Sequence, residues 1–152
     1  MPKALFRCSG TGSVGEPFRE AGWEVTDVDW CPRFNPEIVT DITMWDYTSV
    51  FKPGYFDVIW ASPDCTQYSR ARTTGGPRNY EEADRLAQAC RDIIEYLQPY
   101  CWFIENPDSG DLKRRPCIEG LPYVRVDYYM YERPYRKGTG VWANYTDWTS
   151  HL

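Results

Sequence analysis

Cys65 is the side chain of this sequence best suited to covalent chemistry. It lies in the segment Ser62-Pro63-Asp64-Cys65-Thr66-Gln67-Tyr68-Ser69, directly after the apolar residues 55–61, which are typical of a buried strand. A cysteine in a polar loop near Arg70 and Arg72 is a candidate nucleophile, because nearby positive charge favours the thiolate. A structural thiol is the alternative interpretation. Glu105, at the end of another predicted strand, favours the catalytic one.

The first part of the chain has residues typical of a nucleotide-type cofactor site. Gly10, Gly12 and Gly15 form a G-x-G-x-x-G turn after the short apolar strand predicted at residues 4–8. Such a turn lets the backbone approach a ligand closely, although it suits a dinucleotide equally well. Asp27 is placed to accept hydrogen bonds from a ribose diol, and Asp41 to accept from an amine such as that of adenine. A turn or cap role is the alternative for Asp41.

The spacing of apolar residues predicts the elements that position these groups. A helix over residues 80–97 follows from the helical spacing of Leu86, Cys90 and Ile94, with Asn79 as its N-cap. A shorter helix is predicted at residues 14–21, with Gly22 closing it. Further strands are predicted at residues 23–28, 38–40, 102–104, 123–131 and 140–144.

Strands that alternate with helices predict a mostly parallel α/β sheet flanked by helices. In such sheets ligands bind beyond the carboxyl ends of the strands. Those ends carry the glycine turn, Asp27, Asp41, Cys65 and Glu105. The sequence therefore predicts that five chemical groups converge on one edge of the sheet.

Composition and charge limit the function classes. The chain has 152 residues and a net charge of −5, which argues against a general nucleic-acid binder. Residues 65–137 hold 12 of the 17 basic residues, so we expect any phosphate contact to come from there. No C-x-x-C pair and no long apolar run occur, so we expect no metal site, no signal peptide and no membrane span. Free thiols suggest a reducing cytoplasm, bacterial or phage-infected.

Several segments together resemble one enzyme family. L-F-x-x-S-G-T-G-S-V-G, D-V-D and D-I-T resemble the first three motifs of the C5-cytosine DNA methyltransferases. The segment around Cys65 resembles the fourth, Pro-Pro-Cys-Gln with a serine four residues past the cysteine. Glu105-Asn106-Pro107 resembles the sixth motif, and residues 134–139 occupy the place of the eighth. The pattern looks like short phage-encoded members of the family.

The resemblance implies a Rossmann-like class I methyltransferase fold, with S-adenosylmethionine as cofactor and DNA, single- or double-stranded, as substrate. Cys65 would add to carbon 6 of a flipped cytosine, with Glu105 at ring nitrogen 3 and Asn106 orienting Glu105 or the loop. Arg136 and Lys137 would hold the base carbonyl or a phosphate. The implied cofactor contacts are Ser9, Gly10, Thr11, Gly12, Ser13, Val14, Asp27, Val28, Asp41, Ile42 and Ser62. The implied substrate contacts are Pro63, Gln67, Ser69, Arg70 and Arg72.

The sequence departs from the family pattern at several positions. Cys8 and the spacing at Arg7 differ from the usual F-x-G-x-G turn, and Asp64 replaces the second proline beside the nucleophile. Thr66 stands where glutamine is usual, and Thr139 where the eighth motif has its second arginine. These departures leave open a second class of function, a module that binds the cofactor or nucleic acid without catalysis.

The resemblance covers one catalytic domain, residues 1–152, without the target-recognition domain that full-length relatives carry after the eighth motif. We therefore expect weak sequence specificity, a single-stranded substrate, or a partner protein or dimer that supplies recognition. Cytidine nucleotide or RNA as substrate, a sulfonium donor of another group, and an unrelated dinucleotide-binding domain remain alternatives.

Overall fold

The computed structural model describes residues 1–7, 14–70, 72–127 and 138–145. Its strands are β1 (Lys3–Arg7), β2 (Glu24–Asp29), β3 (Ile38–Val39), β4 (Val58–Ala61), β5 (Cys101–Pro107), β6 (Tyr123–Asp127) and β7 (Gly138–Ala143). Its α-helices are α1 (Glu16–Glu20), α2 (Tyr47–Val50) and α3 (Tyr80–Leu97), and its 3-10 helices are η1 (Pro32–Phe34), η2 (Leu112–Arg114) and η3 (Pro116–Ile118).

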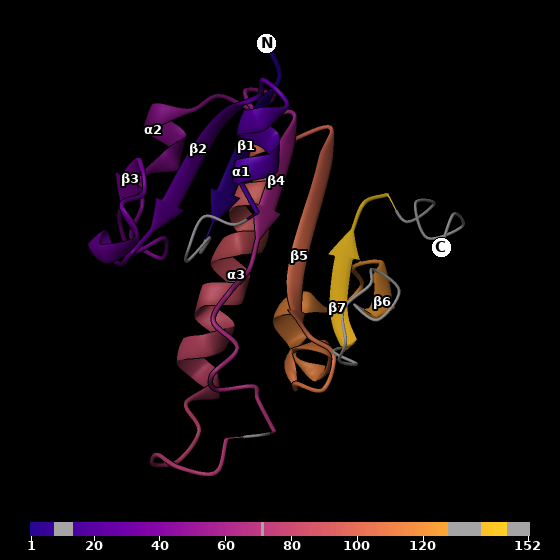
Figure 1. The fold of residues 1–152 in the computed structure, drawn as a ribbon. Coiled ribbons are helices and arrows are strands. Elements are labelled where there is room, and N and C mark those ends of the chain that lie inside the picture. Colours follow the sequence, from indigo (N-terminus) through magenta and orange to yellow (C-terminus); the bar gives the residue numbers. More distant parts are fainter. Residues whose placement is uncertain (8–13, 71, 128–137, 146–152) are drawn as a thin grey trace.

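The strands of the described residues form one seven-stranded sheet in the order β3-β2-β1-β4-β5-β7-β6 (Figure 1). Strands β3, β2, β1, β4 and β5 are parallel, and β7 runs antiparallel between β5 and β6. The predicted mostly parallel α/β sheet is confirmed. Its five parallel strands end at one edge, and the described segments that carry chemistry begin there.

Helix α3 covers one face of the sheet because its apolar stripe meets the inward residues of the central strands. Ala83, Ala87, Cys90, Ile94 and Leu97 are buried on this stripe. They pack in one cluster with inward residues of the sheet, among them Leu5, Val28, Ile59, Ile104 and Trp142. The helix begins and ends at the predicted residues.

Helix α1 lies on the opposite face. Successive strand residues point to opposite faces, so Phe6 faces away from Leu5 and the α3 side. The Phe6 ring meets Phe18 of α1 edge to face at 5.1 Å, and Phe18 meets Trp23 at the same distance. Gly22, at φ 84°, closes α1 as predicted, since this left-handed conformation suits glycine. The α1 and α3 faces therefore have separate apolar contacts.

Several strand bounds differ from the prediction. Strand β5 extends to Pro107, three residues past its predicted end, because β7 pairs with it as far as Thr139. Strand β4 starts only at Val58, and β2 runs one residue further, to Asp29. No helix of the described residues is long and apolar enough to cross a membrane.

Asn79 caps α3, and its loss should weaken the fold measurably. Its side-chain oxygen accepts the backbone N–H of Glu82 at 3.1 Å, and its amide donates to the Glu82 carboxylate at 3.0 Å. We expect Asn79→Ala to lower the free energy of unfolding by about 1 kcal/mol in urea denaturation. Gln88→Ala, on the exposed side of the same helix, should change it by less than about 0.5 kcal/mol. Equal effects would contradict the capping role.

Candidate active site at the carboxyl edge of the sheet

The loop that carries Cys65 is joined to the end of β5. Ala61 ends β4 in register with Ile104 of β5, so the residues after β4 lie beside Glu105 and Asn106. The buried Asn106 amide donates to the backbone carbonyl of Pro63 at 2.9 Å. The candidate nucleophile and the candidate acid therefore belong to neighbouring, hydrogen-bonded segments.

Cys65 begins a tight turn and is partly buried. Its carbonyl accepts the backbone N–H groups of Tyr68 at 3.0 Å and Ser69 at 2.9 Å. Asp64 Oδ1 accepts the Thr66 backbone N–H at 2.9 Å and the Thr66 hydroxyl at 2.6 Å. Thr66, which replaces the usual glutamine, thus fixes the start of the turn together with Asp64.

Tyr68 anchors this turn in the core. It is fully buried, and its hydroxyl donates to Asp84 of α3 at 2.8 Å. Arg115 binds the same carboxylate through Nε and Nη2, at 3.0 and 2.7 Å, and lies over the Tyr80 ring. Burial, followed by the bond to Asp84, raises the pKa of Tyr68 far above its usual value, so its hydroxyl stays a donor.

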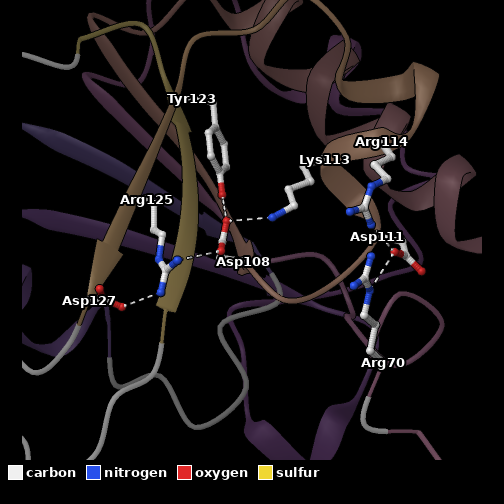
Figure 2. Close-up of polar contacts among 8 residues, drawn as sticks. All are labelled: Arg70, Asp108, Asp111, Lys113, Arg114, Tyr123, Arg125 and Asp127. Carbon is white, nitrogen blue, oxygen red and sulfur yellow. Dashed lines mark hydrogen bonds and ion pairs between the residues drawn. The ribbon is translucent and has the colours of Figure 1, made fainter.

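Two aspartates after β5, Asp108 and Asp111, bind basic and tyrosine side chains from neighbouring segments (Figure 2). Asp108 accepts from the Tyr123 hydroxyl and from Lys113 at 3.1 Å, and lies 3.6 Å from Arg125. The Tyr123 bond, followed by Lys113, lowers the pKa of Asp108. The aspartate therefore remains an anion that binds Lys113, on the connection between β5 and β6, and Arg125 of β6.

Asp111 has the same role on the side of the Cys65 loop. Its carboxylate accepts from the Tyr80 hydroxyl at 2.9 Å, from Arg114 at 2.9 Å and from Arg70 at 3.4 Å. Its backbone N–H donates to the carbonyl of Tyr68 at 3.0 Å. Asp111 therefore links the connection after β5 to the turn of Cys65.

A cavity of about 540 Å³ lies beside this loop, over the carboxyl ends of β1, β2 and β3. Its walls combine carboxylates, two arginines and apolar side chains. The lining residues are Arg7, Val28, Asp29, Trp30, Thr40, Asp41, Ile42, Thr43, Asp64, Glu82, Arg85 and Leu86. The cavity meets the Cys65 loop at Asp64, so a ligand inside it would reach the neighbourhood of the candidate nucleophile.

Asp41 and Ile42 occupy the predicted cofactor side of this cavity. Asp41 Oδ1 accepts the Thr43 hydroxyl at 2.8 Å and the Thr43 backbone N–H at 2.9 Å. These two bonds lower the pKa of Asp41, so the carboxylate is charged at neutral pH and can accept from an amine. Ile42 is buried in the wall beside it.

Asp27, the predicted ribose ligand, lies outside this cavity. Its carboxylate forms an ion pair with Arg19 of α1, and its backbone N–H donates to Glu37 at 2.8 Å. Asp29, at the end of β2, and the exposed Trp30 after it line the cavity instead, with Val28 behind them. The physical reason is that β2 ends one residue later than predicted, so Asp29 is the acid that reaches the sheet edge.

Some predicted substrate contacts have structural partners within the loop. Gln67 Oε1 accepts from Arg72 at 2.8 Å and from the Asn79 backbone N–H at 2.9 Å. Arg72 also donates to the carbonyls of Thr74 and Gly76. These bonds shape the loop, and a role in substrate binding stays a prediction.

The other predicted cofactor and substrate contacts lie in the Cys65 turn, on the surface, or outside the described residues. Ser69 lies in the Cys65 turn, while the Arg70 side chain remains 59% exposed despite its contact with Asp111. Ser62 accepts from the indole of Trp60 at 3.1 Å, away from the cavity. Val14 precedes α1. Ser9, Gly10, Thr11, Gly12, Ser13, Arg136 and Lys137 lie outside the described residues.

Asp29, Trp30 and Arg7 line the cavity although the sequence motifs did not predict them there, and the Asp84–Arg115 pair was not predicted either. The D-V-D run carried a signal for Asp29, since alternation places both of its acids on one side and only the last one at the strand end. Arg115 follows two other basic residues in the sequence. Nothing there marks it as the partner of Asp84, 31 positions away.

Comparison with known proteins shows the family of this chain. The chain is 35% identical over 149 residues to a probable DNA (cytosine-5)-methyltransferase of Frog virus 3 (isolate Goorha). The match covers 90% of this chain and 67% of the viral protein. The chain belongs to the C5-cytosine DNA methyltransferase family. No family model matches this member.

Solved structures of methyltransferases share the fold of this family member. A putative DNA modification methyltransferase encoded within an E. coli prophage matches with a TM-score of 0.67 at 14% identity. The Dnmt2 methyltransferase of S. pombe matches with a TM-score of 0.62 at 16% identity. They cover 97% and 96% of this chain, which spans 49% and 52% of theirs. The class I methyltransferase fold is therefore confirmed for the part that they share.

Tyr68→Phe tests the anchor of the Cys65 turn. The change removes the hydrogen bond to Asp84 in a buried place, so we expect the free energy of unfolding to fall by about 1–2 kcal/mol in urea. Tyr100→Phe is the matched control, because Tyr100 is 90% exposed, and it should change stability by less than about 0.5 kcal/mol. A Tyr68→Phe variant as stable as the control would exclude the anchoring role.

Proposed function

We propose that this protein transfers a methyl group from S-adenosylmethionine to carbon 5 of cytosine in DNA, through a covalent adduct with Cys65. The observation that carries the proposal is the hydrogen bond of Asn106 to Pro63, which joins the Cys65 loop to the strand end that carries Glu105. Asp64 of the same loop lines the cavity. Family membership agrees with it, and the viral relative is described as a probable DNA (cytosine-5)-methyltransferase.

The cavity residues fit the adenosine part of the proposed cofactor. The ionised Asp41 suits the exocyclic amine of adenine, and Asp29 suits the ribose diol. Trp30, Ile42 and Leu86 offer apolar faces for the adenine ring. When bound, this cofactor supplies an electrophilic methyl group.

The residues of this chain supply the activation of the base. Carbon 5 of cytosine is a poor nucleophile until a thiolate adds to carbon 6. Cys65 forms that sulfur–carbon bond, while the carboxyl group of Glu105 gives a proton to ring nitrogen 3 and so stabilises the electron-rich ring. After methylation, water takes the carbon 5 proton, the carbon 5–carbon 6 double bond re-forms, and the Cys65 thiolate leaves. The proton on ring nitrogen 3 returns to Glu105. Asn106 keeps the Cys65 loop beside Glu105 during these steps.

Covalent trapping tests the reaction. Fluorine at carbon 5 cannot leave as a cation, so 5-fluorocytosine oligonucleotides should trap the protein as a methylated adduct in the presence of S-adenosylmethionine. Intact-mass spectrometry should show this adduct for the wild type and not for Cys65→Ser. Single- and double-stranded oligonucleotides are compared in parallel. With cofactor binding confirmed by calorimetry, absence of any adduct would replace the proposal with a binding module or a nucleotide-level substrate.

Asp29 and Asp27 provide a matched pair for the cofactor contact. We expect Asp29→Asn to weaken S-adenosylhomocysteine binding about tenfold or more in calorimetry, since it removes a charge-assisted acceptor from the ribose. Asp27→Asn loses an ion pair with Arg19 outside the cavity, so it should affect thermal stability rather than affinity. The reverse result would return the ribose contact to Asp27.

A further inference from the structure

Arg7 is a buried cation in the cavity, at the end of β1. It is 5% exposed, and its Nη1 donates to Cys90 Sγ at 2.8 Å. Its Nε is buried without a hydrogen-bond partner among the described residues. Burial raises the pKa of the Cys90 thiol, so this neighbour stays neutral at pH 7 and does not balance the guanidinium. A buried N–H group without an acceptor is costly, so the Nε–H of Arg7 favours a ligand group that accepts a hydrogen bond there.

Asp64 is an acid in the wall of the same cavity. Its hydrogen bonds to Thr66 are both made through Oδ1. It stands where the family pattern has a second proline, and Arg7 lies at the unusual spacing before the glycine turn. Two departures from the family pattern thus bring opposite charges to one cavity.

The order of the strands aligns these charges with the parts of the proposed cofactor. Along the edge, Asp41 follows β3, Asp29 ends β2, Arg7 ends β1 and Asp64 follows β4. Adenine at Asp41 and ribose at Asp29 leave β1 and β4 for the part of the ligand beyond the ribose. That part is an α-amino acid group with one carboxylate and one ammonium.

We propose that Arg7 binds the carboxylate and Asp64 the ammonium of the amino acid group of the sulfonium donor. This assignment rests on the proposed function, because it takes S-adenosylmethionine as the ligand of the cavity. A guanidinium binds a carboxylate through charge-assisted hydrogen bonds, and a carboxylate does the same for an ammonium. When bound, the ligand would be oriented by this pair, with its amino acid group toward the ends of β1 and β4.

Calorimetry with four ligands separates the two contacts. The ligands are S-adenosylhomocysteine, its decarboxylated analogue, its deaminated analogue and 5′-methylthioadenosine, which lacks the whole amino acid group. For the wild type, loss of either group should weaken binding about tenfold to a hundredfold. Arg7→Met should bind S-adenosylhomocysteine and its decarboxylated analogue with nearly equal affinity. It should still bind the deaminated analogue more weakly, as the wild type does. Asp64→Asn should show the opposite pattern.

The controls distinguish failure of this inference from failure of the proposed function. Affinity for 5′-methylthioadenosine should be equal in all variants, and Arg85→Met, another cation of the same cavity, should keep both penalties. Arg7→Lys keeps the charge without the planar guanidinium, so its affinity should still fall in part when the ligand lacks the carboxylate. This variant tests the same contact if Arg7→Met does not fold. A wild type that binds all four ligands equally, or penalties unchanged in the variants, would overturn the inference. A wild type that binds none of the four would overturn the proposed cofactor itself.

Discussion

The parallel register of β1, β2, β4 and β5 is the constraint on which the site depends. Backbone hydrogen bonds fix Arg7 against Val28 on one side and against Ala61 on the other, and Ala61 against Ile104. Because these strands run in the same direction, the segments that follow them leave the sheet at one edge. The cavity and the Cys65 loop are therefore neighbours through main-chain pairing.

Aspartates distribute the positive charge of the second half of the chain. Asp84, Asp108 and Asp111 bind arginines and Lys113 in the region from which the sequence alone predicts any phosphate contact to come. These bonds connect α3, the Cys65 turn and the segment between β5 and β6. Figure 2 shows the ion pairs of Asp108 and Asp111. These basic residues are thus engaged in ion pairs with nearby aspartates.

Three departures from the family pattern, at Arg7, Asp64 and Thr66, have hydrogen-bond partners in the structure. Thr66 bonds to Asp64 in the turn, and the hydroxyl of Tyr68 extends the anchor of that turn to Asp84 and Arg115. Arg7 reaches α3 through Cys90. Thr66 thus acts within its own turn, whereas Arg7 contacts a residue 83 positions away in the chain, which a motif comparison does not take into account.

The sequence by itself determined the sheet class, helix α3 with its Asn79 cap, and the segments that carry Cys65 and Glu105. These features depend on local spacing and on the rule that parallel strands share a carboxyl edge. Only the tertiary structure decided that Asp29 reaches the cavity while Asp27 pairs with Arg19, and that Asp84 holds Tyr68 and Arg115. Strand ends are set by pairing with neighbouring strands, and ion pairs join residues that are distant in sequence, so neither follows from local pattern.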